Sequence, residues 1–379
     1  MLDLATIETL KQLMYKSMES DAALLNTLRD EIRPLKGMTK RIFPRSTTSI
    51  SLVGTDGGNN KLIFDPFIIQ IIRVVDSSNN EYYMDVITPT TPIQDLNNKI
   101  INRAGKQFDA LGEMMDYLEV TSLAQLSPMI NDNPKEKPVS PSWVQVYREL
   151  VEWATLFSII KNKDFGTDTL IVFDGLLRSK VFSQDLFLKL RKGIDDAIQL
   201  QWEKSRRRIY VVGVAKHSKV LERYQLAMFI EGTMVHPYPC YVEIPREVEE
   251  KAYVWSEYAK DDTFPAGGEK NKFVGGKMHF VKFGSGKHDP IWPVDILLSQ
   301  VGTAGTIIGY LLADALDGFP VPFYPLCLQK AHQNAALVDF DMDIIQDQVL
   351  EAIRSVLGPD APQLDSFLLV DKDPAQSRY

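Results

Sequence analysis

The chain has 379 residues, of which 45% are hydrophobic and 24% are charged, a composition that is ordinary for a soluble globular protein. A formal net charge of −8 excludes a protein that coats nucleic acid through a globally positive surface, although it leaves room for a local basic groove. Two widely separated cysteines, Cys240 and Cys327, exclude a disulfide framework and a zinc ribbon, and they favour a reducing, cytoplasmic setting.

The chain begins with helical periodicity and without the basic and apolar pattern of a secretory signal. We therefore expect a helical N-terminal extension over residues 1–45 that packs on the rest of the protein. No apolar run approaches the roughly 20 residues that a bilayer crossing needs, so we expect no membrane association.

From residue 50 the pattern changes to short extended runs, which predict antiparallel strands. The predicted strands cover residues 50–54, 61–64, 67–75 and 82–87, with turns at residues 57–60 and 77–80. Asp56 follows the first of these strands and is itself followed by Gly57.

A predicted helical stretch over residues 93–126 leads to a helix at residues 143–160 that carries two candidate acidic groups. Glu149 lies at the edge of the apolar stripe of this helix, whereas Glu152 points further toward its polar side. Either glutamate can be a site residue or an ordinary solvated helix residue.

A second apolar strand ends in Asp174 and Gly175, a helix is predicted at residues 182–201, and the strand at residues 208–216 delivers Lys216 at its end. The alternation of strands and helices predicts a mixed α/β sheet. Between the last two elements lies a basic cluster with Arg206 and Arg207, which is either a solvated helix end or a contact for DNA phosphates.

The region of residues 236–293 is strand-like, and its glycine-rich loop before Lys287 predicts a hairpin rather than a phosphate loop, because Lys287 is not followed by Ser or Thr. A helix is predicted at residues 296–317. Pro325 then begins a helix that carries His332 about two turns along, with Tyr324 just before it. Taken alone, His332 is more typical of a hydrogen-bonded structural histidine than of a metal ligand.

Asp56 and Asp174 each follow an apolar strand and precede a glycine, which lets a ligand approach the backbone closely. Mg²⁺ and Mn²⁺ prefer carboxylate ligands, and a histidine in the set favours Mn²⁺. The two aspartates therefore predict a divalent-metal site.

In its order of motifs the chain resembles the NurA nuclease family, the partners of HerA-type hexameric DNA translocases. The matching blocks are the first strand with Asp-Gly (residues 53–58), the acidic helix before the second Asp-Gly-x-Leu (residues 171–177), the Val-Gly-Val-Ala-Lys strand (residues 212–216) and the late Tyr-Pro-x-x-Leu to Ala-His-x-x-Ala block (residues 324–335).

The resemblance implies an RNase H-like mixed β-sheet flanked by helices. By position it also implies a catalytic set whose members are Asp56, Glu149 or Glu152, Asp174, Tyr324 and His332. Lys216, Arg206 and Arg207 are the expected DNA contacts, and Mn²⁺ or Mg²⁺ is the expected cofactor.

The function implied is a metal-dependent DNA nuclease, an exonuclease in this family, that acts as a homodimer with a HerA-like ATPase in DNA end processing or defence. The nuclease domain would span residues 46–379, with insertions at about residues 89–140 and 236–293. Two alternatives stay open: a non-catalytic scaffold of the same fold that regulates a partner ATPase, and a small-molecule α/β enzyme that uses Asp56-Gly57-Gly58 as a nucleotide loop.

Overall fold

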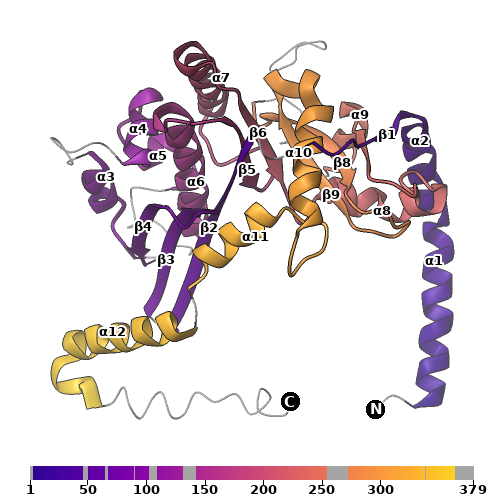
Figure 1. Cartoon of the computed structure of the whole chain (residues 1–379). Helices are drawn as coiled ribbons and strands as arrows, with labels where there is room; N and C mark the ends of the chain where they lie inside the picture. The colour runs from indigo at the N-terminus through magenta and orange to yellow at the C-terminus, as the bar shows by residue number, and fades with distance from the viewer. Residues whose placement is uncertain are drawn as a thin grey trace.

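The computed structural model describes residues 3–45, 50–64, 67–88, 90–101, 109–130, 142–253, 272–337 and 339–362, as drawn in colour in Figure 1. In the strand that begins at residue 50, as far as residue 64, and at residues 67 and 68 the backbone alone is described. The same holds for residues 4, 5, 20, 101 and 339–343.

Within these residues, nine strands form one sheet in the order β1-β7-β8-β9-β6-β5-β2-β3-β4. The strands are β1 (Lys40–Arg41), β2 (Ile50–Phe64), β3 (Phe67–Asp76), β4 (Glu81–Ile87), β5 (Asp168–Asp174), β6 (Ile209–Val214), β7 (Cys240–Glu243), β8 (Gly276–Lys282) and β9 (Ile291–Leu297). The predicted mixed α/β sheet is therefore confirmed.

The half of the sheet that runs β4-β3-β2-β5-β6 has the RNase H-like arrangement. The strands β2, β3 and β4 form an antiparallel meander, and β5 and β6 then add on in parallel beside β2. Because parallel neighbours start and end at the same edges of a sheet, the carboxyl ends of β5 and β6 meet at one edge.

Helices cover both faces of the sheet. The helices are α1 (Leu4–Ile32), α2 (Leu35–Met38), α3 (Ile93–Ile101), α4 (Ala110–Tyr117), α5 (Leu123–Leu126), α6 (Ser142–Asn162), α7 (Leu186–Ser205), α8 (Lys219–Glu231), α9 (Arg246–Glu250), α10 (Ala304–Leu316), α11 (Leu326–Ala335) and α12 (Asp339–Leu357), with 3₁₀-helices η3 (Leu298–Thr303) and η4 (Gly358–Asp360).

Strand β5 shows how one strand serves two cores. Ile171 and Phe173 belong to the cluster formed with α3 to α7, whereas Leu170 and Val172 belong to the cluster formed with α10 and α11. Successive side chains of a strand point to opposite faces, so a strand buried on both faces is apolar throughout. Because the strand is buried on both faces, the position of Asp174 at its end is fixed.

The predicted turn at residues 57–60 is wrong, because β2 runs without interruption from Ile50 to Phe64. The pairing with β5 stops at Thr55, but the antiparallel pairing with β3 continues, with Gly57 opposite Val74 and Asn60 opposite Ile71. This ladder keeps the glycine- and asparagine-rich segment extended. Asp56 thus lies inside a strand rather than at its end.

Three helix predictions differ from the structure in their bounds. The stretch over residues 93–126 is divided into α3, α4 and α5, and the helix predicted from residue 182 begins only at Leu186. In the segment predicted as a helix from residue 296, the first two residues end β9 and the next six form η3, so α10 starts only at Ala304. The turn at residues 77–80 and the hairpin between β8 and β9 are confirmed.

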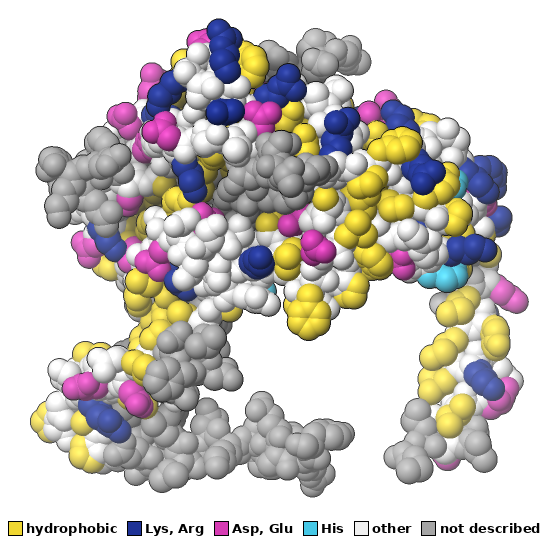
Figure 2. All heavy atoms as spheres, in the orientation of Figure 1, with side chains coloured by type: hydrophobic (Ala, Val, Ile, Leu, Met, Phe, Trp, Pro, Cys, Tyr) yellow, Lys and Arg dark blue, Asp and Glu magenta, His cyan; other side chains and the backbone are white. Residues whose placement is uncertain are grey.

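Two helices project from the body of the molecule, α1 at one end and α12 at the other (Figure 1). The C-terminal end of α1 packs on α8 through the buried Ile32, whereas apolar side chains nearer its N-terminus are exposed. Figure 2 shows these hydrophobic side chains along the projecting helix. No helix among the described residues is both long and apolar enough to cross a membrane.

Candidate metal-dependent active site

Asp174 ends β5 at the edge of the sheet where its strand leaves the core. The four residues before it are buried, but 19% of its own side chain is exposed. Gly175 then turns the chain at φ 130°, a conformation that favours glycine, while its N–H donates to the Val214 carbonyl over 2.9 Å. A carboxylate is thus held firmly at an accessible position.

Two side chains from distant parts of the sequence meet this carboxylate. The Tyr324 hydroxyl donates to Asp174 Oδ1 over 3.0 Å, and Lys216 Nζ lies 3.5 Å from Asp174 Oδ2. Lys216 Nζ also lies 5.8 Å from the centroid of the Tyr324 ring. The structure therefore brings together three of the predicted site residues.

Tyr324 is rigidly held, with only 2% of its surface exposed. Its carbonyl accepts a hydrogen bond from Gln329 Nε2 at 2.9 Å, and its ring centroid lies 4.8 Å from that of Trp292. Neither Gln329 nor Trp292 was indicated by the sequence, because each acts only by supporting Tyr324.

Asp56 lies beside Asp174 in the backbone register. Thr55 of β2 pairs with Phe173 of the parallel strand β5, and each aspartate follows its member of that pair by one residue. Adjacent strands are about 4.8 Å apart, so the two backbones are close neighbours. The side chain of Asp56 lies outside the described part of the structure.

Glu149 of α6 points toward the segment that follows β5. Its Oε1 accepts a hydrogen bond from Ser179 Oγ at 2.5 Å, and burial raises the pKa of this carboxyl above its ordinary value. Glu152 instead forms an ion pair with Arg148 at 3.2 Å. Ser179, which sequence reasoning missed, links Glu149 to the chain five residues beyond Asp174.

The segment after Asp174 crosses over β6, where a glycine leaves room for it. A Cβ atom on Gly213 would lie 2.4 Å from the Gly175 carbonyl oxygen and 2.9 Å from the Leu177 amide nitrogen. The Leu177 carbonyl then accepts from the Gly275 N–H at 2.7 Å. The path of the chain directly after the candidate ligand therefore depends on the absence of a side chain at position 213.

A buried ion-pair cluster anchors the same segment one residue further on. The guanidinium of Arg178 contacts both Asp295 oxygens, at 2.7 and 2.8 Å, and also contacts Glu249. Burial opposes its charge, but the carboxylates of Asp295 and Glu249 raise the pKa of Arg178 well above its ordinary value. Nothing in the sequence pattern indicated this cluster.

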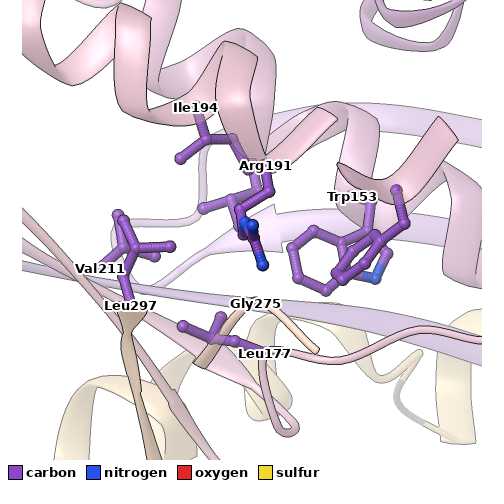
Figure 3. Close-up of a pocket in the computed structure, with 9 residues that line it drawn as sticks. Trp153, Leu177, Arg191, Ile194, Val211, Gly275 and Leu297 are labelled. Carbon is purple, nitrogen blue, oxygen red and sulfur yellow. The ribbon is translucent and has the colours of Figure 1, made fainter. Parts of the chain in front are cut away.

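Figure 3 shows the adjoining pocket, where Leu177 and Gly275 face Trp153 and Arg191 from α6 and α7. Its volume of about 10 Å³ is at the lower limit for a single water molecule. We therefore assign it to the packing of the segment and not to a ligand.

His332 lies on α11, the helix that packs across β2 and β3 (Figure 1). The side chain is exposed. The far end of the helix is tied to β3, because Asn334 Nδ2 donates to the Asp76 carbonyl at 3.1 Å. The helix predicted after Pro325 is confirmed as α11, Leu326–Ala335.

Arg206 and Arg207 lie at the opposite end of β6 from Lys216. Arg206 caps α7 with a left-handed backbone at φ 57°, and Ile209 begins β6 three residues later. The structure therefore does not bring these arginines to Asp174, and their role as DNA contacts stays a prediction.

Asp76 is a further carboxylate near Asp56, since it pairs with Thr55 across β2 and β3. Its Oδ1 accepts from the Ser78 and Asn80 amides, and its Oδ2 accepts from Asn80 Nδ2 and Tyr82. These bonds close the turn after β3, so Asp76 is a structural carboxylate.

The donors fit a hard divalent cation in their chemistry. Asp174 presents a partly exposed carboxylate, and the sheet register sets the backbone of Asp56 beside it. Among the described side chains no group of three or more acidic, histidine or cysteine residues is placed to hold a metal ion. The side chain of Asp56 lies outside that part, and its role as a ligand stays a prediction.

Comparison with known proteins gave matches among solved structures, whereas no family model and no curated protein matched. The NurA nuclease from Sulfolobus solfataricus is 12% identical, with 93% of this chain and 98% of that chain covered and a TM-score of 0.43. NurA with manganese is 13% identical, with 91% and 98% covered and a TM-score of 0.40. NurA bound to dAMP and manganese is 12% identical, with 89% and 94% covered and a TM-score of 0.36. These three solved structures are NurA nucleases, and the motifs of this chain resemble the same family.

Proposed function

We propose that this protein is a divalent-metal-dependent nuclease that hydrolyses the phosphodiester bonds of DNA. The observation that carries the proposal is the register of the two parallel strands β2 and β5, which sets Asp56 beside Asp174. Two carboxylates at neighbouring positions suit a site for one or two Mn²⁺ or Mg²⁺ ions.

The proposed ligands are Asp56, Asp174, His332 and Glu149, with Glu152 as the alternative helix residue. A bound divalent metal would supply an activated water and neutralise charge on the scissile phosphate. His332 on α11 and Asp56 on β2 come from elements in contact, which supports their pairing. For Glu149 to bind a metal, its carboxylate must either keep the hydrogen bond from Ser179 on one oxygen or give it up for the metal.

The remaining site residues act on the substrate and on Asp174. Tyr324 orients the Asp174 carboxylate through its hydrogen bond. Lys216 is 44% exposed and lies 3.5 Å from the same carboxylate, which supports a role for its ammonium in contacting the phosphate of the substrate. The positive charge needed for the DNA is therefore local, in agreement with the acidic net charge of the whole chain.

The proposal is tested with linear single- and double-stranded DNA in the presence of Mn²⁺, Mg²⁺ or EDTA. We expect cleavage with metal, none with EDTA, and a loss of at least about a hundredfold in Asp174→Asn, because the amide keeps the shape but removes the charge that binds metal. Asp168→Asn, at the other end of β5, is the matched control and should cleave normally.

Retained cleavage in a folded Asp174→Asn protein would refute the site. Absence of cleavage by the wild-type protein under every metal condition, with the partner ATPase included, would favour the alternative of a non-catalytic scaffold of the same fold.

We further propose that the nuclease works as an exonuclease together with a HerA-like hexameric ATPase, in DNA end processing or defence. This part rests on the motif resemblance. Co-purification of the two proteins, and stimulation of cleavage at DNA ends by the ATPase with ATP, test it. Equal cleavage of closed circular and linear DNA would contradict the exonuclease assignment.

The homodimer that the resemblance implies has a suitable surface on α1. Leu13, Met14 and Met18 are 60%, 57% and 67% exposed on this projecting helix. Apolar side chains gathered on a protruding element are typical of a contact surface. We expect Met14→Glu combined with Met18→Glu to give monomers in light scattering.

The control for the dimer is Gln12→Glu combined with Lys16→Glu, on the polar face of the same helix. These substitutions should leave the oligomeric state unchanged. A monomeric wild-type protein at micromolar concentration would contradict the dimer without affecting the proposed chemistry.

A further inference from the structure

A second candidate site lies at the other end of the β6 strand. A surface pocket of about 300 Å³ is lined by residues from the end of α7, the start of β6 and η3. Its lining residues are Ile198, Gln199, Trp202, Arg207, Arg208, Ile209, Tyr210 and Gln300. The volume is at the lower end of the range of small-molecule sites, about 300–1,000 Å³.

The pocket combines an aromatic surface with guanidinium groups. The guanidinium carbons of Arg206 and Arg208 lie 5.6 and 5.8 Å from the centroid of the Trp202 ring, which is only partly buried. Arg207 lines the pocket and, in the part of the chain that the structure describes, has no hydrogen-bond or ion-pair partner. A pocket that holds both an unpartnered guanidinium and an aromatic ring is suited to an anionic, planar ligand.

The carboxylates near the pocket are already engaged. Asp168 accepts the Arg208 backbone N–H at 2.9 Å, and Asp164 pairs with Lys204 at 2.7 Å. Glu203 accepts from Gln199 Nε2 at 2.9 Å. The segment of residues 202–208 thus carries four cationic side chains and one acidic side chain, and its local charge is positive although the protein is acidic.

The floor of the pocket is rigid. Gln300 Nε2 donates to the Ile209 carbonyl at 2.7 Å, while its Oε1 accepts from the Val211 N–H at 2.9 Å. Tyr210 is buried, with its ring centroid 6.4 Å from that of Tyr310. A ligand therefore meets a fixed wall on one side and the arginine side chains on the other.

We infer that this pocket binds one nucleotide unit, with the phosphate at Arg207 and Arg208 and the base against Trp202. The inference rests on the proposed function, since a nuclease must hold its strand outside the reacting bond. Val214 follows Ile209 by five positions along β6, so the pocket lies about 16 Å from the Asp174 end of the sheet. The ligand is either a nucleotide of the bound DNA strand, roughly five nucleotides away from the cut at B-form spacing, or a free mononucleotide.

The test measures binding of labelled single-stranded (dT)20 in EDTA to the full-length protein, so that metal and cleavage play no part. We expect Arg207→Ala combined with Arg208→Ala to weaken binding about tenfold, because phosphate contacts and base stacking of this kind are each worth a factor of that order. Loss of the contact to this one phosphate should also flatten the dependence of log affinity on log salt by about 0.7. Trp202→Leu should weaken binding with no change in the salt dependence.

The matched control is Lys189→Ala combined with Lys192→Ala, which removes two charges from the exposed side of the same helix α7. It should bind (dT)20 within about twofold of the wild-type protein. Competition by dTMP distinguishes a nucleotide of the bound strand from a free mononucleotide. If the arginine variant loses binding of dTMP but binds (dT)20 as the wild-type protein does, the ligand is a free mononucleotide.

Unchanged binding of both ligands in the arginine variant, or equal weakening in the lysine control, would overturn the inference. A different result tests the proposed function. Asp174→Asn should lose cleavage but keep its affinity for (dT)20 in EDTA, and retained cleavage would refute the function without affecting the pocket.

Discussion

The hydroxyl of Tyr324 donates to the carboxylate of Asp174 over 3.0 Å, although the two residues lie 150 positions apart in the chain. One belongs to the connection between α10 and α11 and the other ends β5. This bond joins the C-terminal part of the chain to the centre of the sheet at the carboxylate that we propose binds the metal. Removing this hydrogen bond would therefore change the orientation of the Asp174 carboxylate while leaving its charge in place.

Tyr324→Phe removes this hydrogen bond and keeps the ring packed on Trp292. We expect the Mn²⁺ concentration for half-maximal cleavage to rise about tenfold, as is usual when a ligand loses its supporting hydrogen bond. Tyr310→Phe, on α10 near the far end of β6, is the control and should match the wild-type protein. An unchanged metal requirement in Tyr324→Phe would show that the bond has no part in holding the ligand.

The competition between the two helix glutamates is settled by a pair of substitutions. Glu149→Gln should lower metal-dependent cleavage at least about tenfold, because Glu149 faces the segment after Asp174, whereas Glu152→Gln should retain it because Glu152 is engaged with Arg148. Cleavage rates at saturating and limiting Mn²⁺ give the comparison. The reverse result would assign the ligand to Glu152, and two unaffected variants would remove α6 from the site.

Glu149 also makes a prediction for stability in the absence of metal. Its pKa is raised in the folded protein by burial, so it binds its proton more tightly there than in the unfolded chain, where the ordinary value is 4.5. The favourable contribution is complete below about pH 4.5 and is lost as the pH rises through the folded-state pKa. In urea unfolding, the free energy of unfolding of the wild-type protein should fall relative to that of Glu149→Gln as the pH rises from about 4.5 through the folded-state pKa.

For this pH effect the control is Glu119→Gln, because the Glu119 side chain is 82% exposed. It should follow the wild-type protein at every pH. A constant difference in unfolding free energy between wild type and Glu149→Gln from pH 4 to pH 8 would contradict the burial argument.

Gly213→Ala tests the path of the chain after Asp174. The added Cβ would come within 2.4 Å of the Gly175 carbonyl oxygen, so either β6 or the crossing segment must shift. We expect a loss of about 1–3 kcal/mol in the free energy of unfolding and a larger loss of cleavage than the stability change explains. Gly166→Ala, where a Cβ meets nothing within 4 Å, should change the stability by less than about 0.5 kcal/mol.

The sequence alone determined the elements whose signal is local. The centre of β5, Leu170 to Phe173, and the strand before Lys216 are apolar because both of their faces are buried. Helix α11 follows Pro325 because proline suits a helix start. Glycine after Asp174 indicated a turn, and the turn is present. The mixed α/β class and Asp174 as an accessible carboxylate follow from these short-range patterns.

Only the tertiary structure decided which partners these elements receive. Gly57 to Asn60 have the composition of a turn, yet pairing with β3 keeps them in a strand, because a ladder of backbone hydrogen bonds outweighs local turn preference. The contact of Ser179 with Glu149 and the burial of Arg178 with Asp295 join residues separated by 30 and 117 positions. Such contacts depend on where whole strands and helices pack. The burial of the common core decides this packing, and the contacting residues themselves do not.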